Sequence, residues 1–286
     1  MSESRSLGGR TLLISGGSRG IGLAIALRAA RDGANVALIA KTDQPHPKLE
    51  GTIHTAATAI EEAGGKALPI LGDVRDEDRV AAAVAETVER FGGIDVCVNN
   101  ASAINLARTE ALELKRYDLM QDINVRGTFA VSRACIPHLR GRENPHILTL
   151  SPPLDLDPRW LGPHIGYTLA KYGMSLIALG LAAELREDGI ASNALWPRTL
   201  VATAAVQNLL GGDAAMARAR KPEVYADAAY AVLNRPARDC TGNAFLCEDV
   251  LVAEGVTDLS IYSYVPGAEL AVDLFVDAAN PPGVTS

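Results

Sequence analysis

The stretch TLLISGGSRGIG, residues 11–22, decides the fold. A β-rich run at 11–15 is followed by Gly16, Gly20 and Gly22, and an Ala/Leu-rich segment to about residue 32 predicts a helix. Glycines let a backbone turn sharply and approach a pyrophosphate, whose charge the amides of a helix N-terminus then face. A plain tight turn can have the same letters, so the interpretation depends on the rest of the chain.

Short apolar runs and helical stretches alternate along the sequence. The runs are residues 11–15, 35–40, 66–74, 94–101, 146–151, 190–196 and 243–247. Helical patterns cover residues 52–63, 76–91, 115–140, 164–187 and 222–234. Strands that are apolar throughout and separated by helices indicate a parallel sheet covered on both faces. We therefore predict an α/β fold with a doubly wound parallel sheet of the Rossmann type.

The chain has 286 residues, 48% of them apolar, which suffices for a large core. Without an evident linker, we predict a single domain over 1–286, with a core at about 8–250 and a C-terminal tail at about 251–286. Residues 198–221 interrupt the alternation and predict a helical lid over the carboxyl ends of the strands, where open α/β sheets bind ligands.

Charge and cysteine usage narrow the class of partner. The net charge is −7 and no long basic run is present, which argues against nucleic acid or an anionic membrane as partner. The four cysteines form no C-x-x-C pair, so we predict reduced thiols and no metal site. The first residues, MSESRSLGG, resemble no secretory signal, and we expect a cytoplasmic protein with a small-molecule substrate.

The end of the second strand indicates which nicotinamide dinucleotide would bind. An acid there would hold a ribose 2′-hydroxyl. This chain has Lys41 instead, with Arg19 in the glycine turn, and two cations suit a 2′-phosphate. NADP is therefore favoured, although the nearby Asp43 leaves NAD open. Asp73, after the third strand, either binds the adenine amino group or caps the next helix.

These features, with NNAS (99–102), NVRG (124–127) and YTLAK (167–171), resemble the short-chain dehydrogenase/reductase family over about residues 8–250. Further segments, such as HILTLSPPLDLDP and NALWPRT, resemble its hydroxysteroid dehydrogenase-like group. The resemblance implies Tyr167 as general acid/base, Lys171 as its cationic partner, Asn124 in a water relay and Asn99 in the cofactor wall. It also implies a homodimer or homotetramer. The positions expected to bind the dinucleotide are Gly16, Ser18, Arg19, Gly20, Ile21, Gly22, Lys41, Asp73, Val74, Asn100, Ala101, Tyr167, Lys171, Pro197 and Thr199.

Tyr167 and Lys171 are four residues apart, which places them on one face of a helix about one turn apart. A nearby ammonium favours a phenolate, so we expect Lys171 to lower the pKa of Tyr167. The phenol then exchanges a proton with a substrate oxygen, which is general acid/base catalysis.

The family's substrate-binding serine has no clear counterpart. It is commonly the second residue of a Ser-Ser pair, and Pro152 stands in that place. Ser151 is the nearest hydroxyl, and it would reach the substrate only if the loop at Pro152 and Pro153 redirects the chain. Otherwise Tyr167 acts alone or with a lid residue such as Thr199.

For several weaker signals we prefer a structural interpretation to a functional one. His164 is expected to be solvated at a helix start, and Arg218, Arg220 and Lys221 to form a solvated basic turn rather than a site for a carboxylate or coenzyme A phosphate. Met174, Met216 and Trp196 are expected in the core rather than in a ligand pocket. Tyr262, Tyr264 and Phe275 are expected to pack on their own or a neighbouring subunit.

The main hypothesis is an NADP-dependent oxidoreductase that interconverts an alcohol and a carbonyl on an apolar substrate of lipid or terpenoid type. A different class, an NADP-binding sensor or scaffold without catalysis, and a different reaction, enoyl-thioester reduction, remain open.

Overall fold

The first strand is an inner strand, paired on both sides, of a seven-stranded parallel sheet with the order β3-β2-β1-β4-β5-β6-β7. The structure is a computed structural model that describes residues 6–45 and 51–277. Residues 1–5, residues 46–50 and the last part of the predicted tail, residues 278–286, lie outside the described residues. The strands are β1 (Thr11–Ser15), β2 (Asn35–Ala40), β3 (Lys66–Leu71), β4 (Val96–Asn99), β5 (His146–Thr149), β6 (Ala191–Trp196) and β7 (Ala244–Leu246).

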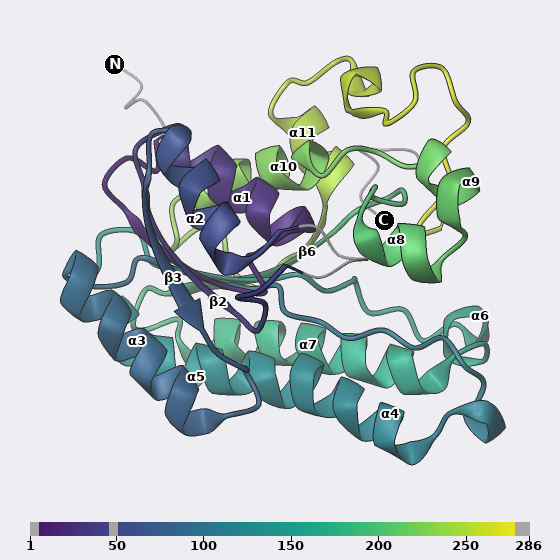
Figure 1. Ribbon diagram of the computed structural model, residues 1–286, viewed down its shortest axis with the longest axis horizontal. Coiled ribbons are helices and arrows are strands. Elements are labelled where there is room, and N and C mark those ends of the chain that lie inside the picture. The colour runs from purple at the N-terminus through teal and green to yellow at the C-terminus, as the bar shows by residue number, and fades with distance from the viewer. Residues whose placement is uncertain (1–5, 46–50, 278–286) are drawn as a thin grey trace.

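Helices cover both faces of the sheet (Figure 1). One face carries α1 (Gly20–Ala30), α2 (Ile53–Glu62), α10 (Glu223–Leu233) and α11 (Cys247–Ala253). The other carries α3 (Glu77–Phe91), α4 (Leu114–Met120), α5 (Gly127–Leu139) and α7 (Ile165–Glu184). Short helices α6 (Pro158–Leu161), α8 (Ala204–Leu209) and α9 (Gly212–Ala217) lie in loops. The doubly wound parallel sheet predicted from the alternation is confirmed.

The strand order reverses at β1, whose neighbours are β2 on one side and β4 on the other. Every residue of β1, β4, β5 and β6 is buried, as expected for strands covered on both faces. The two apolar layers are centred on α1 with α10, and on α3, α5 and α7. The reversal creates a crevice at the carboxyl ends of the strands, where the site lies.

Two predicted boundaries were wrong. The strand predicted to run to Val74 ends at Leu71, because its partner β2 ends at Ala40, opposite Leu71. The helix predicted over 115–140 consists of α4, a π-helical segment at Gln121–Arg126, and α5. Such a widened turn has i→i+5 hydrogen bonds and is frequent at functional sites.

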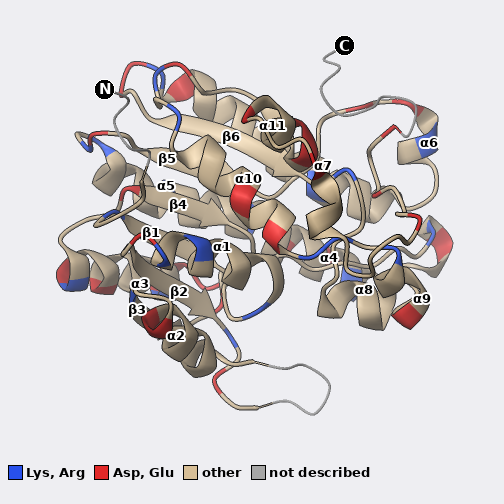
Figure 2. Ribbon diagram, turned by 90° about the horizontal axis from the view of Figure 1, so that it is seen from above, with Lys and Arg blue, Asp and Glu red and all other residues tan. Residues whose placement is uncertain are grey.

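Among the described residues one helix, α7, has the length and apolar composition of a membrane span. It is mostly buried, with 61% of its apolar window inside the protein, and it packs on β5, β6 and the π-helical segment. We therefore interpret α7 as a core helix. Acidic and basic residues are interspersed over the described surface (Figure 2). All four cysteines are buried and free.

Candidate active site

A cavity of 720 Å³ opens at the carboxyl ends of the strands. Most of the residues predicted to bind a dinucleotide line it, and they come from five separate βα connections and α7. These residues are Gly16, Ser18, Arg19, Gly20, Ile21, Lys41, Asp73, Val74, Asn100, Ala101, Tyr167, Lys171 and Pro197. Four predicted site residues do not line it, namely Gly22, Thr199, Ser151 and Asn124.

The glycine turn has the shape of a phosphate cradle. Gly16 has φ +69°, and a Cβ on it would stand 2.9 Å from Ala101 Cα. A Cβ on Gly22 would stand 2.6 Å from Asn100 Nδ2. That same amide donates to the carbonyl oxygens of Ser15 (2.9 Å) and Gly16 (2.8 Å), so Asn100 ties the loop after β4 to the turn. Gly22 thus has a packing role behind the cradle rather than a contact in the cavity.

The N-terminus of α1 is open to an anion. Its N-cap residue, Arg19, makes no side-chain capping bond, and its first turn carries no acid. Gly20 and Ile21, at the start of the helix, line the cavity. Free amides at a helix N-terminus bind phosphate groups, so this turn fits the pyrophosphate of a dinucleotide.

Charged residues bound the end of the cavity where the sequence predicts the adenosine, which we call the adenosine end. Lys41 Nζ lies 3.4 Å from Asp73 Oδ2, and Arg75 binds the same carboxylate through two nitrogens. Hydrogen bonds from Arg75 lower the pKa of Asp73 to about 2, with Lys41 adding to the effect. Arg19 donates to the Gly51 carbonyl (2.8 Å), and its Nε is buried without a hydrogen-bond partner among the described residues. Asp43, which kept NAD open, does not line the cavity.

Tyr167 and Lys171 lie in the first two turns of α7, and both are buried, at 5% and 4% exposure. The helix can expose both to the cavity because they share one face. Lys171 Nζ donates to the Leu150 carbonyl oxygen (2.9 Å) beyond β5 and lies 5.1 Å from the centre of the Trp196 ring. Helix α7 is therefore fixed against the ends of β5 and β6.

Burial dominates the electrostatics of this pair. It lowers the pKa of Lys171 to about 7, and it raises the pKa of the Tyr167 phenol, with the charge of Asp273 raising it further. The expectation that Lys171 lowers the pKa of Tyr167 is not met in the protein alone, because burial and the charge of Asp273 both raise it. The phenol is thus protonated at neutral pH.

The π-helical segment holds Asn124 in a fully buried position. Its amide pairs with the backbone of Ala103, accepting from the nitrogen (2.7 Å) and donating to the oxygen (3.0 Å). The side chain therefore fixes the loop after β4. Any part in a water relay would fall to the backbone of this segment, and that role stays a prediction.

A family model described as short chain dehydrogenase matches residues 10–212. This chain belongs to the short-chain dehydrogenase family. It is therefore an oxidoreductase of a family that uses NAD or NADP.

The relatives support a narrower grouping of this short-chain dehydrogenase. It is 54% identical over 95% of its length to hydroxysteroid dehydrogenase-like protein 2 of Xenopus tropicalis, and 51% identical over the same share to that of Homo sapiens. The chain spans 64% of the length of each. The crystal structure of a short chain dehydrogenase from Mycobacterium thermoresistibile is 72% identical and matches with TM-score 0.92, covering 97% of this chain and 99% of that one. The resemblance predicted from sequence is confirmed.

Ser151 does not occupy the position expected of the dehydrogenase serine. It is fully buried, and its hydroxyl has no hydrogen-bond partner among the described residues. The loop after it is fastened to α7, because Ser175 Oγ donates to the Pro152 carbonyl (2.6 Å) and Tyr172 OH donates to the Asp155 carbonyl (2.6 Å). The loop is thus held against α7, and Ser151 does not line the cavity.

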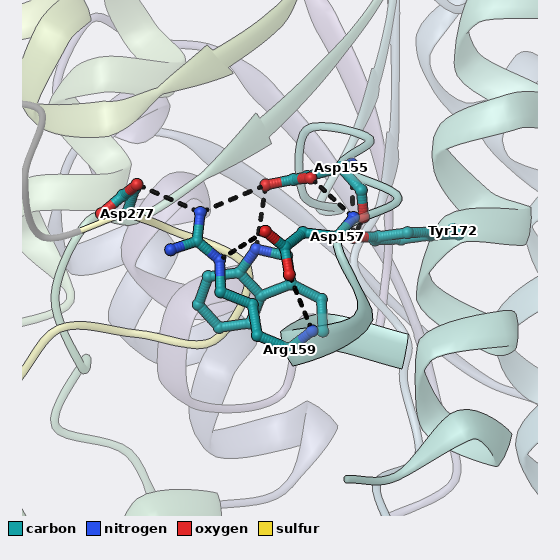
Figure 3. Close-up of polar contacts among 6 residues, drawn as sticks. Asp155, Asp157, Arg159, Tyr172 and Asp277 are labelled. Atoms are coloured by element: carbon teal, nitrogen blue, oxygen red, sulfur yellow. Dashed lines mark hydrogen bonds and ion pairs between the residues drawn. The ribbon is translucent and has the colours of Figure 1, made fainter. Parts of the chain in front are cut away.

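Figure 3 shows how the rest of that loop closes on itself. Asp155 accepts from Trp160 Nε1 (3.0 Å), and Asp157 caps the start of α6 by accepting from the Arg159 nitrogen (2.9 Å). The Arg159 side chain reaches Asp277, 3.1 Å away, near the end of the described chain. The loop after β5 and the C-terminal segment therefore support each other.

Four polar residues lie elsewhere than the sequence predicted. Asn99 is not in the cavity wall but inside the sheet layer, where its Nδ2 donates to Ser132 Oγ (2.8 Å). His164 is buried rather than solvated, with its ring edge against Tyr167. Arg220 is buried and pairs with Glu248 at 3.3 Å, so it meets an internal carboxylate instead of water. Thr199 also donates to Glu248 (3.1 Å), away from the cavity.

Sequence reasoning missed the far end of the cavity. Trp196, Val201, several residues of α8, Tyr225, Asp273 and Leu274 line it. The contribution of α8 agrees with a lid over residues 198–221. Phe275, expected to pack on its own or a neighbouring subunit, packs on Tyr167, Tyr172 and Trp196 of its own chain. No motif marks these positions, because they come together only through tertiary packing.

Proposed function

We propose that this protein is an NADP-dependent oxidoreductase that interconverts an alcohol and a carbonyl on an apolar substrate, with Tyr167 as the general acid/base. The observation that carries this proposal is that Tyr167 and Lys171 line the same cavity as the glycine turn. A proton donor and a dinucleotide cradle in one cavity are the two parts that such a redox step requires.

The dinucleotide, when bound, supplies the hydride for reduction or accepts it in oxidation. In reduction the neutral phenol of Tyr167 gives its proton to the substrate oxygen, and its raised pKa keeps that proton in place until then. In oxidation the phenol must first ionise, and a positive charge on Lys171 one helical turn away stabilises the phenolate. The buried setting excludes water from this exchange.

The choice of NADP and of an apolar substrate rests on the two ends of the cavity. Arg19 and Lys41 line the adenosine end, and a pair of cations suits a 2′-phosphate. Trp196, Val201 and Leu274 line the other end, where an apolar molecule would displace water favourably. The exposed apolar side chains of Phe129 on α5 and of Leu169 and Leu176 on α7 favour the homo-oligomer that the family implies.

A carbonyl panel with NADPH tests this function, using decanal, 2-decanone, cyclohexanone and benzaldehyde as probes. We expect NADPH oxidation with at least one probe, and a loss on the order of 10³ in kcat/KM in Tyr167→Phe with NADPH affinity kept, because the proton donor alone is removed. Tyr172→Phe is the matched control, since its phenol bonds a loop and does not line the cavity.

The displaced Ser151 favours one rival, a sensor or scaffold that binds NADPH without catalysis. Tight NADPH binding with no turnover of any probe would support that rival and refute the proposal. Reduction of a crotonyl thioester to its saturated product, with no carbonyl reduced, would instead identify an enoyl-thioester reductase.

A further inference from the structure

The C-terminal segment 271–277 returns to the active site and lies along the loop after β6. Val272 forms an antiparallel bridge with Thr199, and the Asp273 nitrogen donates to the Arg198 carbonyl (2.9 Å). The Leu200 nitrogen donates to the Ala271 carbonyl (2.9 Å). The segment is therefore built into the substrate end of the cavity by backbone hydrogen bonds rather than lying loosely over it.

Side chains then fix the orientation of the same segment. Trp196 Nε1 donates to the Leu274 carbonyl (2.9 Å). Phe275 adopts φ +67°, a conformation that costs a non-glycine residue energy, and packs within an aromatic cluster that includes Tyr167. Beyond it, Asp277 pairs with Arg159 (Figure 3). These contacts hold Asp273, which lies between Val272 and Leu274, in one position.

That residue, Asp273, presents a carboxyl to the cavity. Of the residues that line the cavity in the described chain, only Asp73 and Asp273 carry one. Asp73 lies at the adenosine end and is bound by Arg75 and Lys41. Asp273 is half-buried, and within the described chain it accepts one hydrogen bond, from the Leu274 nitrogen to Oδ1 (2.7 Å). Its other oxygen is left for a ligand.

The charge of Asp273 acts on the catalytic pair. It raises the pKa of both Tyr167 and Lys171, as expected for a carboxylate that lines the same cavity as these two groups. Burial and the charge of Glu248 raise the pKa of Asp273 to about 7, against the opposing effect of Lys171. The titratable groups around Asp273 are Tyr167 and Lys171 on α7, Tyr225 on α10, and Cys247 and Glu248 on α11.

We propose that the Asp273 carboxyl is the second group, beside the Tyr167 hydroxyl, that hydrogen-bonds the reacting oxygen of the substrate, in place of the Ser151 hydroxyl. This inference rests on the proposed function, because it assigns a further residue to the same reaction. Ser151 lies off the cavity, whereas Asp273 lines it together with Tyr167.

The protonation state of Asp273 suits both directions of the reaction. A neutral carboxyl donates a hydrogen bond to a carbonyl oxygen, as a protonated aspartate does in an apolar oxyanion hole. As the carbon–oxygen double bond becomes single, Tyr167 transfers its proton to that oxygen, and Asp273 keeps its own. A carboxylate instead accepts the hydrogen of an alcohol and orients it for oxidation. The substrate thus needs one polar oxygen at the reacting carbon, and the rest of it is apolar.

Reduction of decanal by NADPH in the full chain tests the inference. We expect Asp273→Ala to lower kcat/KM by about 100-fold, as for the loss of one preorganised donor. Asp273→Asn keeps an N–H donor at nearly the same size, so it should lose no more than about tenfold, and it also serves if the alanine variant does not fold. NADPH affinity, measured by quenching of tryptophan fluorescence, should stay within about twofold in both variants.

Two further variants separate the carboxyl from its surroundings. Asp277→Asn weakens the same segment through its Arg159 contact but does not line the cavity, and Ser151→Ala removes the expected serine. Both should stay within about threefold of the wild-type kcat/KM, since neither removes a substrate contact.

The inference is overturned if the kcat/KM of Asp273→Ala stays within about threefold of wild type, or if Asp273→Ala weakens NADPH binding instead. It is also overturned if Ser151→Ala or Asp277→Asn lowers kcat/KM as much as Asp273→Ala does. Tyr167→Phe separates this result from a failure of the proposed function. If wild type turns over decanal and Tyr167→Phe does not, while Asp273→Ala is unaffected, only the assignment of Asp273 fails. If wild type turns over no carbonyl, the proposed function and this inference fall together.

Discussion

The cavity has one end that we propose for the nucleotide (the nucleotide end) and one that we propose for the substrate (the substrate end). The two ends are built by different means. At the nucleotide end, consecutive βα connections place backbone groups and glycines around a cradle, with Gly16 and Asn100 in direct contact. At the substrate end, stretches as far apart as Trp196, Tyr225 and Asp273 meet through side chains. The first construction depends on the backbone path of the sheet, and the second on individual side chains that can change without changing the fold.

A buried ion network holds the substrate end in place. Glu248 is 1% exposed and accepts from the Arg198 nitrogen (2.8 Å) and the Thr199 hydroxyl (3.1 Å), while Arg220 pairs with it. Arg198 binds Asp249 through two nitrogens. A buried charge without its partner is costly, so each of these groups keeps the others in place. The segment 198–221, predicted as a lid, therefore starts and ends at residues held by this network.

The comparison predicts that the nucleotide end tolerates no added volume. In Gly22→Ala the new Cβ would lie 2.6 Å from Asn100 Nδ2 and 2.9 Å from the Gly16 carbonyl oxygen, and both belong to the cradle. We expect NADPH affinity to fall by about 10- to 100-fold, because overpacking a closed contact costs about 1–3 kcal/mol. Fluorescence titration with NADPH measures it.

Gly180→Ala is the control, because a Cβ at this position on α7 meets nothing within 4 Å. It should leave NADPH affinity unchanged and slightly raise the melting temperature, since alanine favours a helix. An unchanged affinity in Gly22→Ala would show that the cradle does not hold the dinucleotide.

The sequence predicted β1, the glycine turn and α1, because that information is local. The apolar runs marked the buried strands, and the spacing of Gly16, Gly20 and Gly22 marked the turn between β1 and α1. The end of β3 was missed because it depends on where β2 stops, and the π-helical segment was missed because apolar periodicity does not report i→i+5 hydrogen bonds.

The substrate end could not be predicted in the same way. Asp273 lies about a hundred residues after Tyr167 in a segment without a motif, and backbone pairing with the loop after β6 brings it to the cavity. Ser151 looked suitable by position, but the direction of its hydroxyl depends on how Pro152 and Pro153 lead the chain away. Arg220 looked like a surface charge because its partner, Glu248, is distant in the sequence.

Within the nucleotide end, the two cations should contribute unequally to NADP selectivity. Arg19 has a buried Nε without a partner among the described residues, whereas Lys41 is 55% exposed and already paired with Asp73. We expect Arg19→Ala to weaken NADPH binding by about tenfold and Lys41→Ala by about threefold, because exposed, paired charges contribute little. Titrations with NADPH and NADH measure the ratio.

NADH affinity should stay constant in both variants, since NADH lacks the 2′-phosphate. Lys66→Ala removes an exposed cation outside the cavity and serves as control. An equal loss for NADH and NADPH in Arg19→Ala would mean that Arg19 binds the shared part of the dinucleotide, and the preference for NADP would lose its physical basis.

The smallest expected effect is a dip in stability near pH 7, which comes from Lys171 and Asp273 at the junction of the two ends. Burial lowers the pKa of Lys171 from 10.5 to about 7, so the unfolded chain binds more protons between these values and stability rises with pH above 7. Burial raises the pKa of Asp273 from 3.8 to about 7, so the folded chain binds more protons between these values and stability falls as the pH rises towards 7. The joint contribution is therefore least favourable near pH 7.

Chemical denaturation at pH 5, 7 and 9 measures this dip against Lys171→Met/Asp273→Asn, which removes both titrations. Wild type minus double variant should be about 1 kcal/mol lower at pH 7 than at pH 5 or 9, a figure reduced for the partial exposure of Asp273. The single variants separate the two contributions. Asp273→Asn should abolish the fall in stability from pH 5 to 7, and Lys171→Met should abolish the rise in stability from pH 7 to 9. A difference that does not vary with pH would show that the two groups are hydrated in the folded protein, and the dry space shared by the catalytic pair and the C-terminal segment would not exist.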